Sequence, residues 1–115
     1  MQQDRLHLIH LNECIRRIAS HTEGGRARFM DSALVQDAVM WNLRLIGECA
    51  DKVSEPRKKM HPEIDWERVA ALQNIPVHEQ IGLDLEEIWK VVEGELPQIE
   101  RRVKGVLAAL AREVW

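Results

Sequence analysis

The sequence predicts an all-α protein, a bundle of four to five helices, and three features support this class. Apolar residues recur at steps of three and four over several long segments, which places them on one face of a helix. Glycines, prolines and potential capping residues separate these segments. No segment shows the alternating pattern rich in Val, Ile and Thr that is typical of a strand. Helices of this kind bury their apolar faces against one another, so a bundle is expected.

The first two predicted helices are the longest. Residues 4–20 form one helix, and Gly24 and Gly25 prevent its continuation, so the stretch through Phe29 is expected to be a loop. Asp31 is expected to cap a second helix that runs to about residue 53. Pro56 and the basic residues that follow it end this helix. The expected core positions of the two helices are Leu8, Leu11, Cys14, Ile15, Ile18, Ala19, Leu34, Val35, Ala38, Val39, Leu43, Ile46, Ala50 and Val53.

Shorter helices follow. Asp65 is well placed to cap a helix from Trp66 to about residue 72, after which Pro76 forces a break or a new start. Asp84, with Glu87 three residues later, has the capping-box pattern and begins a further helix. Gly94 and Pro97 then interrupt the chain before a final helix, whose apolar positions are Ile99, Val103, Val106, Leu107 and Leu110.

Length and charge limit the class of protein. A chain of 115 residues is expected to form one domain over 1–115, because this size can bury one core without disulfides or a metal. We find no apolar stretch near the roughly 18 residues of a membrane helix and no signal-peptide pattern, so a cytoplasmic protein is expected. The formal net charge of -3 argues against non-specific coating of nucleic acid. His7, His10 and Cys14 lack further clustered ligands, so no metal or other cofactor is expected.

The stretch 73–84 is the most unusual part of the sequence, and it places His78 among polar residues just before a predicted helix. An imidazole can accept and return a proton near neutral pH, and the helix N-terminus that follows favours anions such as phosphate. His78 is therefore a candidate catalytic residue. The alternative is a histidine that only forms hydrogen bonds within a loop, and the residue types alone do not decide between them.

Seven blocks of sequence, in order, resemble the HepT-like proteins of the HEPN superfamily. The resemblance covers about residues 4 to 112. It implies a helical-bundle homodimer, usually the metal-independent ribonuclease toxin of a two-gene toxin–antitoxin pair with a minimal nucleotidyltransferase as antitoxin. The matching blocks are Asp37-Ala38-Val39, Asn42-Leu43, Ile46-Gly47-Glu48, His61-Pro62-Glu63-Ile64-Asp65-Trp66, Asn74 through His78 to Asp84, Ile88-Trp89 and Leu96-Pro97.

The catalytic pattern of that family is incomplete in this chain. The pattern is an Arg, then a His four to six residues later, then a Tyr two residues beyond the His. His78 and the frequent Asn, Asn74, match, but Gln73 stands at the Arg position and Gln80 at the Tyr position. Glutamine lacks the charged fork of donors with which a guanidinium binds phosphate. We therefore expect weakened cleavage of RNA.

The family is understood to be neutralised by adenylylation of the motif Tyr, but this chain contains no tyrosine. Control by that route is excluded, so regulation acts by binding alone or there is little activity to regulate. The alternative function is a non-catalytic dimeric module that binds the nucleotidyltransferase. The sequence leaves open whether Arg44 or Arg68 replaces the missing arginine, although an exposed surface position is the simpler interpretation of each.

Overall fold

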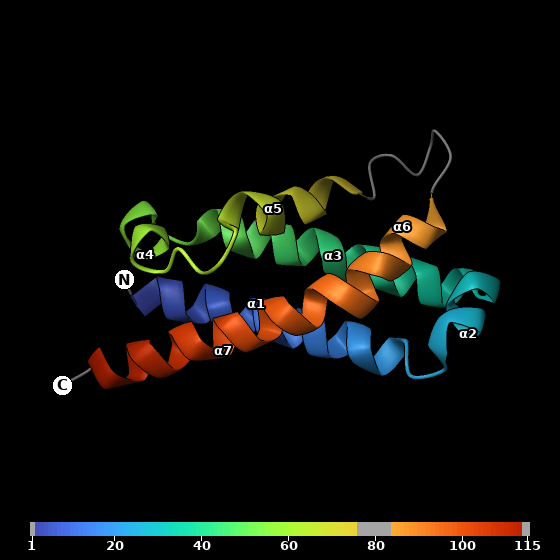
Figure 1. Ribbon diagram of the computed structural model, residues 1–115, viewed down its shortest axis with the longest axis horizontal. Coiled ribbons are helices and arrows are strands. Elements are labelled where there is room, and N and C mark those ends of the chain that lie inside the picture. Colours follow the sequence, from blue (N-terminus) through green and yellow to red (C-terminus); the bar gives the residue numbers. More distant parts are fainter. Residues whose placement is uncertain (1, 76–83, 114–115) are drawn as a thin grey trace.

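The computed structural model describes residues 2–75 and 84–113. Within these residues the chain is almost entirely helical and contains no strand, which confirms the all-α class (Figure 1). None of the helices in the described part is both long and apolar enough to cross a membrane. The elements are α1 (Gln2–His21), α2 (Gly25–Asp31), α3 (Ala33–Lys52), α4 (Glu55–Met60), α5 (Trp66–Ala71), α6 (Leu85–Lys90), the π-helical segment η2 (Val91–Glu95) and α7 (Leu96–Glu113).

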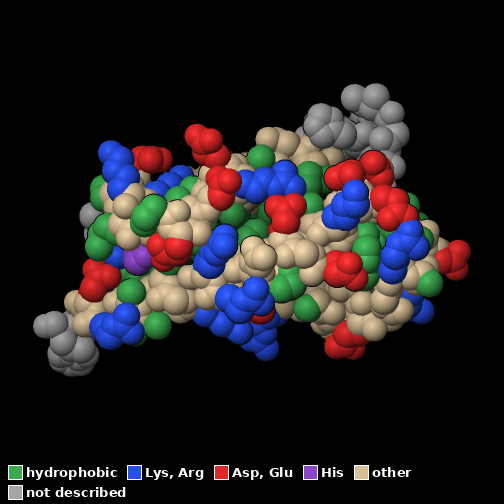
Figure 2. Space-filling model, viewed as in Figure 1, with side chains coloured by type: hydrophobic (Ala, Val, Ile, Leu, Met, Phe, Trp, Pro, Cys, Tyr) green, Lys and Arg blue, Asp and Glu red, His purple; other side chains and the backbone are tan. Residues whose placement is uncertain are grey.

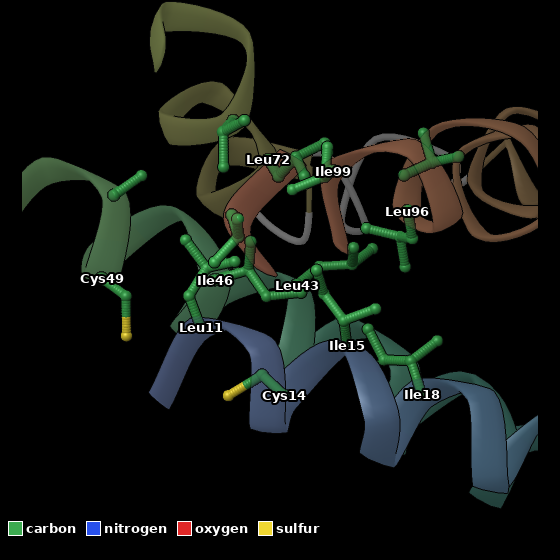
Figure 3. Packing of buried hydrophobic residues seen from close by; sticks show 14 of the residues in the cluster. Leu11, Cys14, Ile15, Ile18, Leu43, Ile46, Cys49, Leu72, Leu96 and Ile99 are labelled. Carbon is green, nitrogen blue, oxygen red and sulfur yellow. The ribbon is translucent and has the colours of Figure 1, made fainter. Parts of the chain in front are cut away.

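The long helices α1, α3 and α7 build the bundle. Helix α3 packs along α1 on one side and against α5 on the other, while α7 crosses back over α1 (Figure 1). Apolar side chains from all of these helices meet in one core. Leu11, Ile15 and Ile18 of α1 lie close to Leu43 and Ile46 of α3, and Leu96 and Ile99 reach them from α7 (Figure 3). The predicted core positions are therefore largely confirmed, but Ala19 and Leu34 are exposed.

The stretch around Phe29, which the sequence predicted as a loop, is instead the short helix α2. Gly25 has a φ of 85°, a conformation that glycine adopts without strain, and it turns the chain into a new helical start. Phe29 is fully buried against Trp89, with ring centroids 5.4 Å apart. Burial of this large ring stabilises a helix that is too short to be stable alone.

The cap of α3 also differs from the prediction. Ser32, rather than Asp31, accepts a hydrogen bond from the amide of Val35, at 3.2 Å. Asp31 is the last residue of α2. The side chains of Ser and Asp cap helices about equally well, so the backbone path selects between neighbouring candidates.

The second long helix ends near residue 53 as predicted, but Pro56 and the basic residues that follow it form a further short helix, α4, that was not predicted. Proline is tolerated in the first helical turn, where the backbone N–H has no partner within the helix. Arg57 is buried and donates two hydrogen bonds to the carboxylate of Glu113, at 2.9 and 3.3 Å. This ion pair connects α4 to the C-terminal end of α7.

Gly94 and Pro97 do not interrupt the chain, and residues 85–113 are helical without a break. The amide of Leu96 donates to the carbonyl of Val91, five residues earlier, in the wide turn of η2. A proline in a helix clashes with the carbonyl four residues before it, and a wider turn relieves that contact. The π-helical segment thus allows α6 and α7 to form one long element.

Candidate functional site

Gln73 and Asn74, two of the predicted site residues, lie in a turn of 3-10 helix at 72–75 that directly follows α5. The side chain of Gln73 is half-buried and its amide is already engaged. Its Nε2 donates to a carboxylate oxygen of Asp51, at 2.7 Å, and to the carbonyl of Ala70, at 2.9 Å. Asn74 is exposed. His78 and Gln80, the other two predicted site residues, lie outside the described residues.

Gly47 of α3 positions this turn. A Cβ atom at residue 47 would lie 2.5 Å from the Cβ of Gln73, 2.6 Å from its backbone nitrogen and 2.7 Å from the carbonyl oxygen of Ala70. Separations below 3.0 Å are not sterically allowed, and two of these three atoms belong to the backbone. The turn can therefore approach α3 this closely only because residue 47 is glycine. Such contact brings Asp51, one helical turn further along α3, within reach of Gln73.

A negatively charged group lies beside the Gln73 side chain. Asp51 is exposed and its carboxylate accepts directly from the Gln73 side chain. A phosphate group at the same position would have to displace a carboxylate of the same sign. Basic and acidic side chains are interleaved on the face shown in Figure 2, over α5, α6 and α7. In the described part of the site, the Gln73 side chain thus donates to a carboxylate and a carbonyl, and neither group attracts the phosphates of RNA.

Arg44 and Arg68, the two possible replacements for the missing motif arginine, both form ion pairs with carboxylates. Arg44 contacts Glu48 at 3.2 Å across one turn of α3, and both side chains are exposed. Arg68 donates two parallel hydrogen bonds to Glu95, at 2.8 and 2.7 Å. These hydrogen bonds lower the pKa of Glu95, although its burial acts in the opposite direction. Both guanidinium groups are thus paired with carboxylates, and among the described residues neither is hydrogen-bonded to Gln73 or Asn74.

Two hollows border the long helix at residues 85–113. One has a volume of about 200 Å³ between α5 and α7, and its lining includes Arg68, Glu95, Gln98 and Arg102. The other, of about 270 Å³, lies between α1 and the stretch from Trp89 to Glu100 and is mainly apolar. Neither is lined by Gln73 or Asn74. The pair of oppositely charged groups in the first hollow could not be recognised from the sequence, because Arg68 and Glu95 lie on different elements.

Among the described residues, no group of three or more His, Cys, Asp or Glu side chains is arranged to hold a metal ion. Cys14 and Cys49 are both buried, with free thiols. Burial raises the pKa of Cys49 to about 11, and Cys14 adds to the effect. The sulfur of Cys49 lies 3.5 Å from Nδ1 of His10. These thiols are protonated at neutral pH, as expected for packed core residues.

Three relatives illustrate what this chain is similar to. A putative RNase of Methanocaldococcus jannaschii is 28% identical over 78 residues, which is 68% of this chain and 72% of the relative. A probable ribonuclease HepT of Thermococcus cleftensis is 31% identical over 72 residues, 63% of this chain and 66% of the relative. A putative RNase of Caldanaerobacter subterraneus is 26% identical over 79 residues, 69% of this chain and 70% of the relative.

No solved structure matches the chain with significance. The family model described as "Ribonuclease HepT-like" matches residues 11–106, which is most of the chain. The match includes α3, the Gly47 contact and the turn that carries Gln73 and Asn74. Together with the all-α fold, it shows that this chain belongs to the HepT-like family of HEPN ribonuclease-related proteins.

Proposed function

We propose that this chain is the HepT-like component of a toxin–antitoxin pair and that its cleavage of RNA is weak. Its site would use His78 for proton transfer, with Gln73, Asn74 and Gln80 as its polar neighbours. The relatives named as RNases support RNA as the substrate class. The reaction requires no metal or other cofactor. Two copies of the chain would form the working unit, and a minimal nucleotidyltransferase would be its partner.

One observation carries the proposal that cleavage is weak: the Gln73 side chain is bound by Asp51 at 2.7 Å. A glutamine in this position is neutral, and its donor is directed at a carboxylate of its own chain. An arginine would bring a positive charge and a fork of donors to the phosphate. Loss of one preorganised donor to the transition state commonly reduces the rate by about a hundred- to a thousandfold.

The same observation favours a second candidate function, a non-catalytic module that binds the nucleotidyltransferase. A carboxylate beside the motif position opposes the binding of phosphate, whereas binding of a protein partner through helical faces does not depend on it. The chain contains no tyrosine, so a partner cannot control it by adenylylating the motif Tyr. Under either function, the partner acts on this chain by binding.

Cleavage of total cellular RNA by purified protein, in the presence of a chelator, tests the proposal. We expect slow cutting by the unaltered chain and none by His78→Ala. His21→Ala, which changes an exposed histidine at the end of α1, is the matched control and should cut like the unaltered chain. A fast, chelator-resistant nuclease would contradict the proposal that activity is weak.

A second series of variants distinguishes two causes of weak cleavage, the missing positive charge at residue 73 and the negative charge of Asp51. Gln73→Arg alone should raise the rate only modestly, because Asp51 remains to pair with the new guanidinium. Gln73→Arg combined with Asp51→Asn should raise it by about a hundredfold, since the guanidinium is then available to phosphate. Gln3→Arg adds the same charge at an exposed position of α1 and is the control. If all of these proteins are inert, the non-catalytic module is the better function.

A further inference from the structure

Helix α3 carries an apolar stripe that the other described residues leave partly uncovered. Leu34 is 80% exposed and Trp41 is 58% exposed, although both are large hydrophobic side chains on a well-packed helix. Ala38 and Leu45 are only partly buried and lie on the same face. The opposite face of α3 is covered, because it packs against α1 and α5. The stripe formed by the two exposed and the two partly buried residues is called the α3 seam below.

The spacing of the α3 seam is that of a helix-pairing surface. Its residues follow one another at steps of four, three and four, as at the core positions of a coiled coil. The sequence of α3 around a midpoint between Val39 and Met40 is nearly self-complementary. If a second copy of α3 packed in the antiparallel direction about this midpoint, Leu34 would meet Leu45 of the second copy, and Ala38 would meet Trp41 of the second copy. Each large side chain would then face an apolar one.

Two exposed charges of opposite sign flank the α3 seam. Asp37 and Arg44 are seven residues apart, so they lie on the same side of the seam. In the antiparallel arrangement this edge of one helix faces the same edge of the other, which places Asp37 close to Arg44 of the second copy. Arg44 contacts Glu48 through its Nε, at 3.2 Å. In a parallel arrangement the same charges would face Val35 and Asn42, which are buried within the bundle.

We propose that the α3 seam is the self-association surface of this protein and that two copies pair antiparallel through it. The spacing of the apolar residues and the positions of Asp37 and Arg44 both match a second copy of this chain, which is the partner that we expect at the α3 seam. A two-fold interface uses the same patch on both subunits, which is what this register provides. The inference builds on the homodimer in the proposed function by naming its face, and its test does not involve RNA.

The first test measures the association of the whole chain by sedimentation. The unaltered protein should sediment as a dimer that dissociates on dilution. Trp41→Glu, which places a charge in the α3 seam, should weaken the dimer by on the order of 30-fold or more, as for a buried aromatic anchor. Leu6→Glu is the matched control, because Leu6 is 62% exposed on α1, outside the seam, and its variant should dimerise normally. Circular dichroism verifies that both variants are folded.

The second test addresses direction and register. Asp37→Arg and Arg44→Asp should each weaken self-association by about tenfold, because each variant brings two like-charged pairs together. An equimolar mixture of the two variants should restore the dimer, because both pairs across the interface then have opposite charges. Recovery on mixing is specific to an interface in which residue 37 faces residue 44 of the other subunit.

The outcomes separate this inference from the proposed nuclease function. A monomeric unaltered chain, a dimer unaffected by Trp41→Glu, or variants that fail to recover on mixing would each overturn the inference, whatever the RNA assay shows. A seam-dependent dimer that does not cut RNA would support the inference and count against catalysis.

Discussion

Substitution of Gly47 by alanine tests how the candidate site is held against α3. The added methyl group would lie 2.5 to 2.7 Å from three atoms of Gln73 and Ala70, two of them in the backbone. Overpacking of this kind costs about 1–3 kcal/mol, and the upper end applies where backbone rather than a flexible side chain must shift. Alanine stabilises a helix interior by about 1 kcal/mol relative to glycine, which offsets part of this cost. The expected net loss is about 2 kcal/mol.

Thermal and urea denaturation followed by circular dichroism measure this loss. For a domain of this length, about 2 kcal/mol corresponds to a fall in Tm of roughly 8 °C. Gly105→Ala is the matched control, because a Cβ at this exposed position in α7 meets no atom within 4 Å. The control should gain up to about 1 kcal/mol from helix propensity alone. If Gly47→Ala is as stable as the unaltered chain, the close contact between α3 and the Gln73 turn does not exist.

Three further predictions concern buried groups. Burial acts to raise the pKa of Asp4, but hydrogen bonds from Ser54 outweigh it and the pKa is lowered. The Asp4 carboxylate therefore stabilises the folded chain above its unfolded pKa of about 4, and this stabilisation is lost as the pH falls through the lower pKa of the folded state. The urea midpoint of Asp4→Asn should therefore depend less on pH in the acid range than the midpoint of the unaltered chain. Glu113→Ala leaves the buried Arg57 unpaired and should cost about 1–2 kcal/mol in urea denaturation, less than for a fully buried pair because Glu113 is partly exposed. Cys49, with a pKa of about 11, should react with iodoacetamide at pH 8 much more slowly in the folded than in the unfolded chain.

Each of these measurements has an outcome that contradicts its reasoning. An equal acid dependence in Asp4→Asn and the unaltered chain would show that the bonds from Ser54 do not stabilise the folded state. Arg112→Ala removes an exposed charge next to Glu113 and is the control for Glu113→Ala. Equal stability of these two variants would exclude the Arg57 ion pair. Rapid alkylation of the native thiol would show that Cys49 is accessible.

The local pattern was sufficient to predict the main helices and most of their buried faces. Asp65 and Asp84 cap α5 and α6 as predicted, because a cap depends on residues within one turn of chain. The same local reasoning failed at α2 and α4, which are too short to be stable alone. Burial of Phe29 against Trp89 stabilises α2, and the contact of Arg57 with Glu113 anchors α4. Both contacts join residues that are more than fifty positions apart.

By itself, the sequence determined the helical class, the residue types at the candidate site and the absence of a tyrosine, since these follow from local spacing and composition. Only the tertiary structure decided what surrounds Gln73. The close contact at Gly47 places Asp51 within hydrogen-bonding distance of Gln73. The fold also pairs Arg68 with Glu95 and Arg44 with Glu48. It also decided that Trp41 is exposed, although Trp41 lies in a mainly apolar helix. Helical periodicity shows which residues share a face, whereas the packing of the other helices decides which face is covered.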